Sequence, residues 1–588
     1  MKLFIHIVLT AILLLAFACR VNKPDALIFT EPKDPEGVDT ADWISVNEGI
    51  NSGFGNTDFR YSRSKPPEGN ITSDISLTGW KGEKVHCQLL FWSVYNESDI
   101  IVTTEKSEED NFIPNNNIII RTVSYVLADE FLNGCGYRKR DTIPSHLMPD
   151  LLDDKNIFSL PGLQTRPVWI SIYIPPETDP GDYNIMITGI SDSDTVSHNI
   201  NLEVQNILLP SPSEWSFHLD LWQNPFAVAR YHDVQLWSQE HMNLLRPLLT
   251  MLAKAGQKCI TTTISPQPWG GQTYDPFETM ITWIKNSDGF WDYDYSVFDQ
   301  YVQLAMDCGI DKQINCYSMV PWNNTFTWFD QDSGTYVTGE AMPGSDKYEG
   351  IWKPFLNDFK AHLLEMGWLE KTAIALDERG HEEMTNMFNF INESAPDFKV
   401  AMAGHFFEDL NTLIYDFSYN WSNISEGTRK VVETRRLDNK VTTYYVACGI
   451  PQPNTFTFSP PSESCYIGWL ASAMGFNGFL RWAYNSWPEN PATDSRFIKW
   501  PSGDTYLVYP GAKSSIRFEK LIEGIQDYEK IRILQHELSL NPSMEAAEAE
   551  IRLKSFLSGI NPSTLDSIHA NEITAKGRHM LNEISRLE

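Results

Sequence analysis

Several motifs that define large protein classes are missing from this sequence. Neither GxGxxG nor GxxxxGK[ST] follows any of the expected strands, which argues against a sheet that binds a dinucleotide or hydrolyses a nucleotide. The segment that most resembles a zinc motif, residues 381–385, lacks the second histidine of HExxH. The sequence therefore predicts no metal site.

Cysteine is also scarce, with 8 in 588 residues. The cysteines are widely scattered, with no CxxC pair and no histidine at ligand spacing, so they predict neither a structural zinc site nor a disulfide framework. We expect most of them to be buried as small hydrophobic side chains. The spacing is compatible with one incidental disulfide.

Basic residues are outnumbered, with 46 Lys and Arg against 77 Asp and Glu and a formal net charge of −31. A surface of this sign repels phosphate backbones, so nucleic acid is excluded as an expected partner.

What the chain has in quantity is apolar surface, since 42% of its residues are hydrophobic. At this length the chain exceeds one ordinary core, and we expect more than one domain.

The N-terminus, MKLFIHIVLTAILLLAFAC, has one lysine and an apolar segment that is too short to span a bilayer comfortably. It predicts an export signal over residues 1–18. Ala16, Phe17 and Ala18 before Cys19 resemble a relaxed bacterial lipobox, which predicts cleavage and a lipid on Cys19. The protein would then be an outer-membrane lipoprotein facing the periplasm or the surface. The alternative is plain secretion.

Residues 25–210 are predicted to form an antiparallel β-sandwich. Short runs of β-branched and aromatic residues alternate with turn residues there, at the spacing typical of sandwiches. A proline and serine break at residues 209–215 marks the expected domain boundary. The runs are VHCQLLFWSVY, NIIIRTVSYVL, RPVWISIYI, YNIMITGI and HNINLEVQNILL.

After the break the pattern changes to strands that alternate with amphipathic helices. Eight such alternations over residues 214–535 favour a (β/α)8 barrel over an open doubly wound sheet. Residues 536–588 are predicted to be a short C-terminal helical region. The expected barrel strands lie in SFHLDLW, CITTTI, QINCYSM, TAIAL, KVAMAGHF, LIYDFSY, TYYVACGI and FLRWAYN.

The fourth barrel strand, TAIAL, runs directly into the adjacent acids Asp377 and Glu378. In barrels of this kind catalytic side chains sit where strands end and loops begin. The alternative is that the two acids only cap the next helix. Their position after a buried strand favours an active site.

Other strand ends carry aromatic, amide and charged side chains that suit a sugar. The flat rings can pack against the C–H faces of a pyranose, while amides and acids pair with its hydroxyl groups. Some of these tryptophans and histidines are expected to be structural, and Tyr444 and Tyr445 point to opposite faces of their strand, so at most one faces the mouth. The candidates are His218, Asp220, Trp222, Trp269, Tyr317, Trp322, His405, Tyr444, Tyr445, Arg481, Trp482, Tyr484, Asn485 and Trp487.

Four segments resemble glycoside hydrolase family 123, a family of β-N-acetylgalactosaminidases. They are HLDLWQNPFAVARY, the strand end ALDE, GFLRWAYNSW, and GDTYLVYPG followed by SIRFEKLIEGIQDYEK. The resemblance covers essentially the whole mature chain. It implies a sandwich, a barrel and a short C-terminal part, and an exo-acting retaining enzyme that removes terminal β-N-acetylgalactosamine from glycans.

The resemblance also implies substrate-assisted catalysis, in which the 2-acetamido oxygen of the sugar attacks its own anomeric carbon. By analogy with family 20 hexosaminidases, Glu378 would be the general acid/base and Asp377 would orient and stabilise the acetamido group. Glu378 would need a raised pKa, which partial burial and the Asp377 charge would favour. Arg379 would oppose this shift, so we predict that it faces away.

The remaining expected roles concern the sugar. Tyr445 would donate to the acetamido carbonyl, Trp482 would stack on the sugar and Asn485 would bind ring hydroxyls. Trp222, Trp269, His405 and Tyr484 are further expected substrate contacts. No metal or organic cofactor is required, because the nucleophile belongs to the substrate. The rival interpretations are a non-catalytic surface glycan-binding lipoprotein, and a two-carboxylate glycosidase that uses a distant acid such as Asp220 or Glu408.

Overall fold

The computed structural model describes residues 29–105, 112–130, 135–136, 142–192, 194–497 and 499–587. The expected signal segment and Cys19 lie outside these residues, so export and lipidation stay predictions. Within the described part, none of the helices is both long and apolar enough to cross a membrane.

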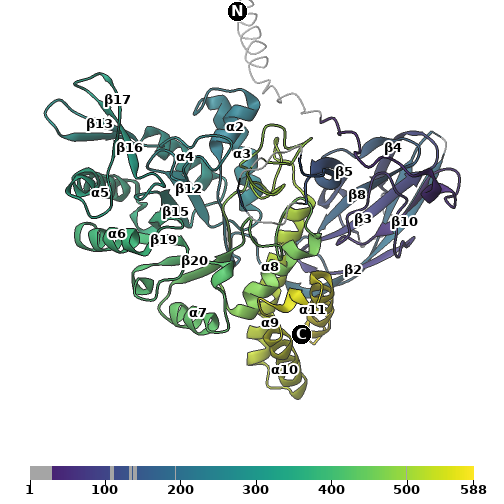
Figure 1. Ribbon diagram of the computed structural model, residues 1–588. Helices are drawn as coiled ribbons and strands as arrows, with labels where there is room; N and C mark the ends of the chain where they lie inside the picture. The colour runs from purple at the N-terminus through teal and green to yellow at the C-terminus, as the bar shows by residue number, and fades with distance from the viewer. Residues whose placement is uncertain are drawn as a thin grey trace, which may run out of the picture. The chain divides into compact units, whose positions relative to one another are not determined.

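The N-terminal part consists of two five-stranded sheets (Figure 1). The inward residues of both sheets, such as Leu89, Val168, Ile187 and Leu202, form one buried cluster between them. This confirms the predicted sandwich, with one parallel pair, β10 with β2, among antiparallel neighbours. In spatial order the first sheet is β1 (Asn51–Gly55), β3 (Lys84–Ser93), β8 (Gln164–Tyr173), β5 (Ile118–Ala128) and β6 (His146–Asp153), and the second is β2 (Ile75–Lys81), β10 (Thr195–Leu208), β9 (Gly181–Ile190), β4 (Glu97–Thr104) and β7 (Ile157–Leu160).

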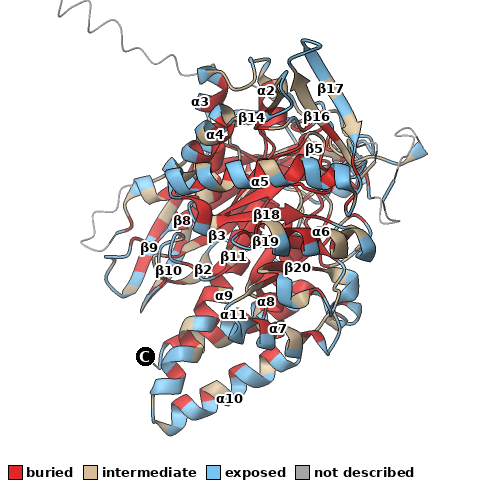
Figure 2. Ribbon diagram, turned by 90° about the vertical axis from the view of Figure 1, so that its left-hand side faces the viewer, coloured by how far each residue is buried: buried red, intermediate tan, exposed pale blue. Residues whose placement is uncertain are grey.

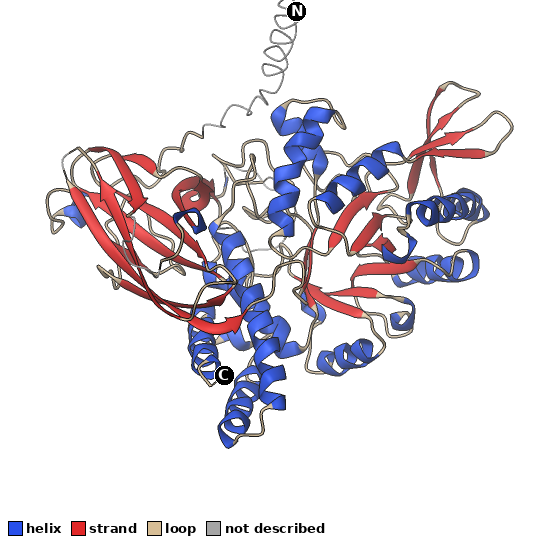
Figure 3. Cartoon of the chain, turned by 180° about the vertical axis from the view of Figure 1, so that it is seen from behind, coloured by secondary structure: helices blue, strands red, loops and turns tan. Residues whose placement is uncertain are grey.

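Eight parallel strands form the barrel, as predicted (Figure 3). Their residues are almost all buried, which explains why they read as continuous apolar runs rather than as alternating ones. In spatial order the strands are β11 (His218–Leu221), β22 (Gly478–Arg481), β21 (Val441–Tyr445), β20 (Asp416–Asn420), β19 (Lys399–Gly404), β18 (Thr372–Leu376), β15 (Gln313–Tyr317) and β12 (Cys259–Thr263).

The two end strands, β11 and β12, are joined mainly through glutamine side chains. The Gln257 Oε1 accepts from the Leu221 backbone N–H at 2.9 Å, and the Gln223 Oε1 accepts from the Thr261 N–H at 2.8 Å. These buried amides take the place of ladder bonds, since unpaired backbone groups would be costly at this depth. The barrel is thereby nearly closed.

Helices cover the barrel and present their outer faces to solvent, as on α5 (Figure 2). The last two helices, α10 and α11, pack on α8 and α9 and form the predicted C-terminal helical region. Several begin at a serine or asparagine whose side chain accepts a backbone N–H of the first turn, including Asn224, Ser345 and Ser515. The helices are α2 (Pro225–His232), α3 (Gln239–Ala253), α4 (Ser296–Asp307), α5 (Asp346–Met366), α6 (His381–Ser394), α7 (Thr428–Leu437), α8 (Pro461–Met474), α9 (Ile516–Leu540), α10 (Met544–Ser558) and α11 (Ala570–Ser585).

A small four-stranded sheet extends from the loops after β12 and β15, and the sequence patterns did not predict it. The stacked rings of Trp283 and Phe355, with centroids 4.4 Å apart, anchor it on α5. Its strands are β14 (Trp291–Asp294), β13 (Thr282–Lys285), β16 (Thr325–Asp330) and β17 (Thr335–Glu340).

The predicted domain boundaries stay predictions, and α9 runs continuously through the expected boundary at residue 535. The first turn of this helix also forms ion pairs with charged side chains of the sandwich strands. Arg517 pairs with Asp150 of β6 at 3.0 Å, and Glu519 accepts from Arg121 of β5 at 3.0 Å. All four side chains are buried. Loss of one partner would leave a buried charge unpaired, so these pairs fix α9 against β5 and β6.

Helices α8 and α9 pack at a pair of glycines. A Cβ at Gly524 would meet the Cys465 carbonyl oxygen at 2.2 Å, and one at Gly468 would meet the Gly524 carbonyl oxygen at 1.9 Å. Backbone atoms cannot move aside as a flexible side chain can. The close approach of these two helices therefore requires glycine at both positions.

Gly524→Ala is expected to lower the free energy of unfolding by about 1–3 kcal/mol or more, because the added methyl group must push α8 and α9 apart. Gly350→Ala in α5 is the matched control, since a Cβ there meets nothing within 4 Å. That control should be neutral or stabilising by up to about 1 kcal/mol. Thermal unfolding of both variants measures the difference, and equal stability of the two would contradict the packing argument.

Candidate active site

A cavity of about 480 Å³ opens at the carboxyl ends of the barrel strands and contains both predicted catalytic acids. Asp377 directly follows β18, Tyr445 ends β21, and Trp482 directly follows β22. Parallel strands bring these chain-distant positions to one rim. The aromatic side chains that line the cavity are Trp222, Trp269, Trp322, Tyr445, Trp482 and Trp500.

Asp377 is nearly buried, with 7% of its surface exposed. The Trp322 Nε1–H donates to its Oδ2 at 2.6 Å, and the Arg379 guanidinium lies 2.9 Å from its Oδ1. Burial is the largest influence on the carboxyl and raises its pKa to about 6, against the opposing charge of Arg379 and the Trp322 hydrogen bond. The predicted orientation of Arg379 away from the acids is therefore wrong, because the guanidinium compensates the buried Asp377 charge.

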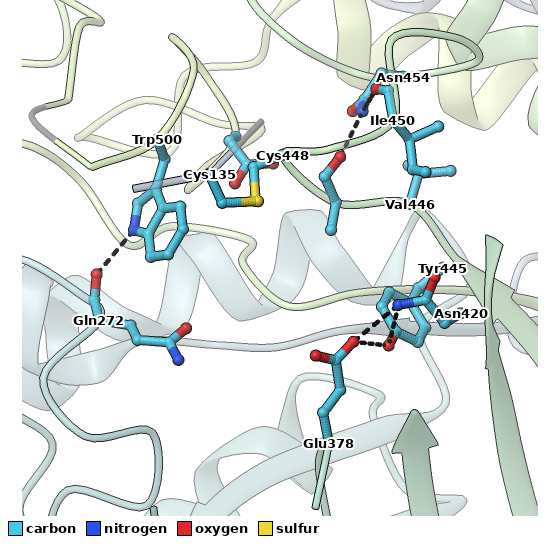
Figure 4. Close-up of a disulfide and its surroundings, with 12 residues drawn as sticks. Cys135, Gln272, Glu378, Asn420, Tyr445, Val446, Cys448, Ile450, Asn454 and Trp500 are labelled. Atoms are coloured by element: carbon cyan, nitrogen blue, oxygen red, sulfur yellow. Dashed lines mark hydrogen bonds between the residues drawn. A yellow bond between two sulfur atoms is a disulfide. The ribbon is translucent and has the colours of Figure 1, made fainter. Parts of the chain in front are cut away.

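Glu378 lies beside it but is exposed to the cavity. Its Oε1 accepts from the Asn420 Nδ2 at 2.9 Å and from the Tyr445 hydroxyl, and the Asn420 Nδ2 also reaches the Tyr445 oxygen at 2.9 Å (Figure 4). The Asn420 Oδ1 accepts from the Ser422 hydroxyl at 2.6 Å, which fixes the amide orientation. Burial, followed by the Glu378 charge, raises the pKa of Tyr445, so the phenol stays a hydrogen-bond donor.

Gly404, the last residue of β19, lies against Glu378. Its φ of +155° is in the region that favours glycine, and a Cβ there would meet the Glu378 Cα at 3.4 Å. That contact is of ordinary van der Waals length, so the positive φ, rather than a lack of space beside Glu378, favours glycine at the end of β19. This contact follows from the strand order, since β19 is the neighbour of β18.

Aromatic rings form a large part of the remaining cavity lining. Trp222 and Trp269 stack with centroids 5.1 Å apart, and Tyr317 packs against Trp222 at 4.6 Å. Trp482 and Trp500 meet edge to face at 5.6 Å. These rings offer the flat apolar surfaces that the C–H faces of a pyranose pack against.

A second cavity of about 440 Å³ adjoins the first and shares Trp322 and Glu378 with it. Arg379, Glu383 and His405 also line it. The His405 Nδ1 pairs with the Asn423 Oδ1 at 2.9 Å. Glu378 thus lines both cavities, whereas Asp377 lines only the first.

Two predicted substrate contacts, Tyr484 and Asn485, do not reach either cavity. The Tyr484 hydroxyl donates to the Leu248 carbonyl at 3.1 Å, and the Asn485 amide donates to the Asn224 carbonyl at 2.9 Å. Both side chains are buried. Both side chains bind backbone carbonyl groups, so the prediction that they contact the sugar is wrong.

His218 and Asp220 also point elsewhere, into the interior of the barrel beneath the cavity. His218 pairs with Asp416 at 3.1 Å, and Asn315 donates to Asp220 at 3.1 Å. Burial and then the Asp416 charge raise the pKa of Asp220 to about 7. His218, Asp416 and Cys259 bring ligand-type atoms within 4.8 Å of one another, an arrangement that the His218–Asp416 pair already accounts for.

Five functional candidates were missed by sequence reasoning. Asn420 ends β20, so the same strand-end rule that selected Asp377 could have found it. Gln272 and Trp500 lie in long loops, where no pattern marks them. The other two, Cys135 and Cys448, form a disulfide that lines the cavity (Figure 4). Their separation of 313 residues carries no sequence signal.

Comparisons with known proteins agree on one family. Residues 222–534 match the model described as glycoside hydrolase 123, catalytic domain, and residues 54–189 match the glycoside hydrolase 123 N-terminal domain. A family 123 glycoside hydrolase from Clostridium perfringens, studied for glycolipid glycan hydrolysis, is 27% identical with a TM-score of 0.82, over 92% of this chain and 98% of that one.

More distant solved structures include a GH10 xylanase from termite gut and the β-glucuronidase of Parabacteroides merdae. Each is 10% identical with a TM-score of 0.31. The xylanase match covers 78% of this chain and 100% of that one, and the glucuronidase match covers 76% and 50%. No curated protein matches the chain significantly.

Proposed function

The chain belongs to glycoside hydrolase family 123, and on this premise we propose that it is an exo-acting, retaining β-N-acetylgalactosaminidase. The proposed mechanism is substrate-assisted, with the 2-acetamido group of the sugar as nucleophile. The C. perfringens enzyme was studied for glycolipid glycan hydrolysis, and we propose glycans of this class as substrates here.

One observation carries the mechanism: the two acids of the cavity are sequence neighbours. A retaining glycosidase with its own nucleophile needs two carboxyl groups about 5–5.5 Å apart on opposite faces of the anomeric carbon. Asp377 and Glu378 extend from adjacent backbone positions and reach the cavity from one side. Among the described residues, they are the only acids that line it.

The proposed first step forms a ring on the sugar and releases the leaving group. The acetamido carbonyl oxygen attacks C1, the bond from C1 to the leaving oxygen breaks, and Glu378 gives its proton to that oxygen. The product is an oxazolinium ring fused to the sugar. In the second step Glu378 takes a proton from water as the water attacks C1, which opens the ring and restores the original anomer.

Asp377 would accept the acetamido N–H and stabilise the positive charge that develops on the nitrogen. A carboxylate has about four lone-pair sites, so the contacts with Trp322 and Arg379 still leave acceptor capacity for the substrate. The same two contacts hold the carboxylate in one orientation. Preorganisation of this kind lowers the cost of stabilising charge at the moment of reaction.

Tyr445 is proposed to move its hydrogen bond from Glu378 to the acetamido oxygen when substrate binds. In the present structure its hydroxyl donates to the Glu378 Oε1. The transfer would orient the attacking oxygen towards C1 and would free the Glu378 Oε1 to face the leaving group. Trp482, with Trp222 and Trp269, would hold the sugar ring.

The two adjoining cavities would hold the sugar and its leaving group, one in each. Glu378 lines both, so its proton can reach the bond between the two spaces. The terminal sugar would occupy the cavity that contains Asp377, and the leaving glycan would extend past Trp322 and His405. Asp220 and Glu408, the distant acids of the rival two-carboxylate mechanism, line neither cavity.

The acetamido group itself provides the test. The protein should hydrolyse 4-nitrophenyl β-N-acetylgalactosaminide with a kcat/KM at least about 10³-fold above that for 4-nitrophenyl β-galactoside, because a tethered nucleophile reacts at a very high effective concentration. Asp377→Asn protein, which lacks the charge that stabilises the acetamido nitrogen, serves as the control for contaminating activity. Efficient turnover of the galactoside would rule out the acetamido nucleophile.

Localisation is a separate part of the proposal. The N-terminal apolar segment and Cys19 support export followed by lipid anchoring to a bacterial outer membrane. An enzyme placed there would meet glycans outside the cell.

A further inference from the structure

The wall of the sugar cavity that faces the catalytic acids is built by four separate segments. They supply Cys135 after β5, Gln272 after β12, Cys448 after β21, and Trp482 and Trp500 after β22. All five line the same cavity as Asp377 and Glu378. We call this set of five residues the far wall.

The far wall is cross-linked at several points. The Cys135–Cys448 disulfide joins two of its segments, and the Trp500 Nε1–H donates to the Gln272 carbonyl at 2.9 Å (Figure 4). The Lys499 Nζ donates to the Gly271 carbonyl at 2.9 Å, and the Gly136 N–H donates to the Lys499 carbonyl at 3.0 Å. The carbonyl groups of Gly271 and Gln272 are therefore both held by hydrogen bonds from the loop after β22.

The side chain of Gln272, unlike its backbone, has no hydrogen-bond partner among the described residues. The residue is half-buried. The other amide in the cavity, Asn420, is already bound to Glu378, Tyr445 and Ser422. Gln272 is thus the amide of the cavity that is left to meet a ligand.

The orientation of the sugar follows from the proposed function, on which this inference rests. Glu378 acts at C1, and Asp377 and Tyr445 hold the acetamido group at C2. In a pyranose ring C4 lies across from C1, and C5 with its hydroxymethyl group lies across from C2. Figure 4 shows Gln272 on the other side of Glu378 from Tyr445 and Asn420. The C4 and C6 hydroxyl groups would then face Gln272.

An amide suits the galacto arrangement of these two hydroxyl groups. An axial C4 hydroxyl lies on the same face of the ring as the C6 hydroxymethyl group, so one side chain can reach both. The amide offers one acceptor oxygen and an N–H donor for the pair. An equatorial C4 hydroxyl points outward in the ring plane, away from a group that bridges this face.

We propose that Gln272 is the specificity-determining residue for galacto over gluco sugars, through hydrogen bonds of its amide to the C4 and C6 hydroxyl groups. The hydrogen bonds from Trp500 and Lys499 hold the backbone of its loop in place. A site that is built to bond a hydroxyl group discriminates strongly against a substrate that leaves its polar groups unpaired.

The test compares Gln272→Leu with wild-type protein on the 4-nitrophenyl β-glycosides of N-acetylgalactosamine and N-acetylglucosamine. The variant should lose about 10- to 100-fold in kcat/KM on the galacto substrate and less than about 3-fold on the gluco substrate. Gln331→Leu makes the same chemical change on an exposed turn of the β16–β17 hairpin. It should alter neither value.

A 4-deoxy galacto substrate separates recognition from a merely structural effect. Wild-type protein should lose about tenfold on it, whereas Gln272→Leu should lose nothing further, because the partner of the hydroxyl group is already gone. Gln272→Asn keeps an amide that is one methylene shorter, and it should fall between wild type and the leucine variant in its galacto preference. It also provides the same comparison if the leucine variant does not fold.

Equal losses on the galacto and gluco substrates, or a wild-type protein without galacto preference, would overturn the assignment of Gln272. So would a wild-type protein that treats the 4-deoxy substrate as well as the parent. These results are distinct from failure of the proposed function, which would appear as wild-type protein that cleaves neither acetamido glycoside.

Discussion

Glu378→Gln protein is expected to lose about 10²–10⁴-fold in kcat/KM on substrates with poor leaving groups, since the amide cannot supply a proton to the departing oxygen. On activated aryl glycosides the loss should be much smaller, because such leaving groups depart without protonation. The substitution keeps the shape of the side chain. Its Oε1 can still accept from Asn420 and Tyr445, so the effect is chemical rather than structural.

The measurement is a series of aryl β-N-acetylgalactosaminides of graded leaving-group pKa. Glu378→Gln protein should show a steeper dependence of kcat/KM on that pKa than wild-type protein does. Glu408→Gln is the matched control, since Glu408 is exposed and lines neither cavity. Equal losses across the series would contradict the role of Glu378 as general acid.

Asp377→Asn protein is expected to lose about 10²–10³-fold in kcat, because the charge that stabilises the acetamido nitrogen in the transition state is removed. Its affinity for an N-acetylgalactosamine thiazoline, which resembles the cyclic intermediate, should fall in parallel. Wild-type protein should be inhibited by this compound. Absence of inhibition would favour an enzyme nucleophile and contradict the mechanism.

The same substitution is expected to stabilise the fold at neutral pH. The folded-state pKa of Asp377, about 6, lies above the ordinary value of 3.8. The folded protein therefore binds this proton more tightly than the unfolded chain does. As pH rises from about 4 to 6, ionisation costs the folded state stability, and a shift of this size corresponds to roughly 3 kcal/mol at most.

Thermal unfolding of wild-type and Asp377→Asn protein between pH 4 and pH 8 measures this effect. The variant should have the higher Tm above pH 6, and the difference should shrink as pH falls towards 4. Loss of the Arg379 partner works against the gain, since that guanidinium would lose its carboxylate. A variant that is less stable at every pH would show that the Arg379 contact outweighs the cost of burying the charge.

The position of the acid pair followed from local pattern and one general rule. TAIAL is short, apolar and bounded by polar residues, and a parallel barrel places the end of every such strand at one rim. The same reasoning placed Trp222, Tyr445 and Trp482 at that rim, and all three line the cavity. It also placed Tyr484 and Asn485 there, where the rule failed, because both side chains turn away to bind backbone carbonyls.

Side-chain directions could be predicted within the strands but not in the loops that follow them. Alternation along a strand determines which residues share a face, so the sequence predicted that at most one of Tyr444 and Tyr445 faces the mouth of the barrel. In the structure the Tyr444 hydroxyl donates to the Ile467 carbonyl, away from the mouth. Beyond the end of a strand this periodicity is lost. The direction of a loop side chain then depends on neighbours that are distant in the chain.

By itself, therefore, the sequence determined the sandwich, the eight parallel strands and the height of Asp377 and Glu378 in the barrel, because these depend on periodic burial and short-range order. Three features became visible only in the folded protein. Arg379 turns inward to pair with Asp377, and Asn420 and Tyr445 both donate to Glu378. The Cys135–Cys448 disulfide lines the same cavity as Gln272. Each of these contacts involves loop or strand-end residues whose partners depend on packing and charge compensation in the folded protein. No local pattern records that dependence.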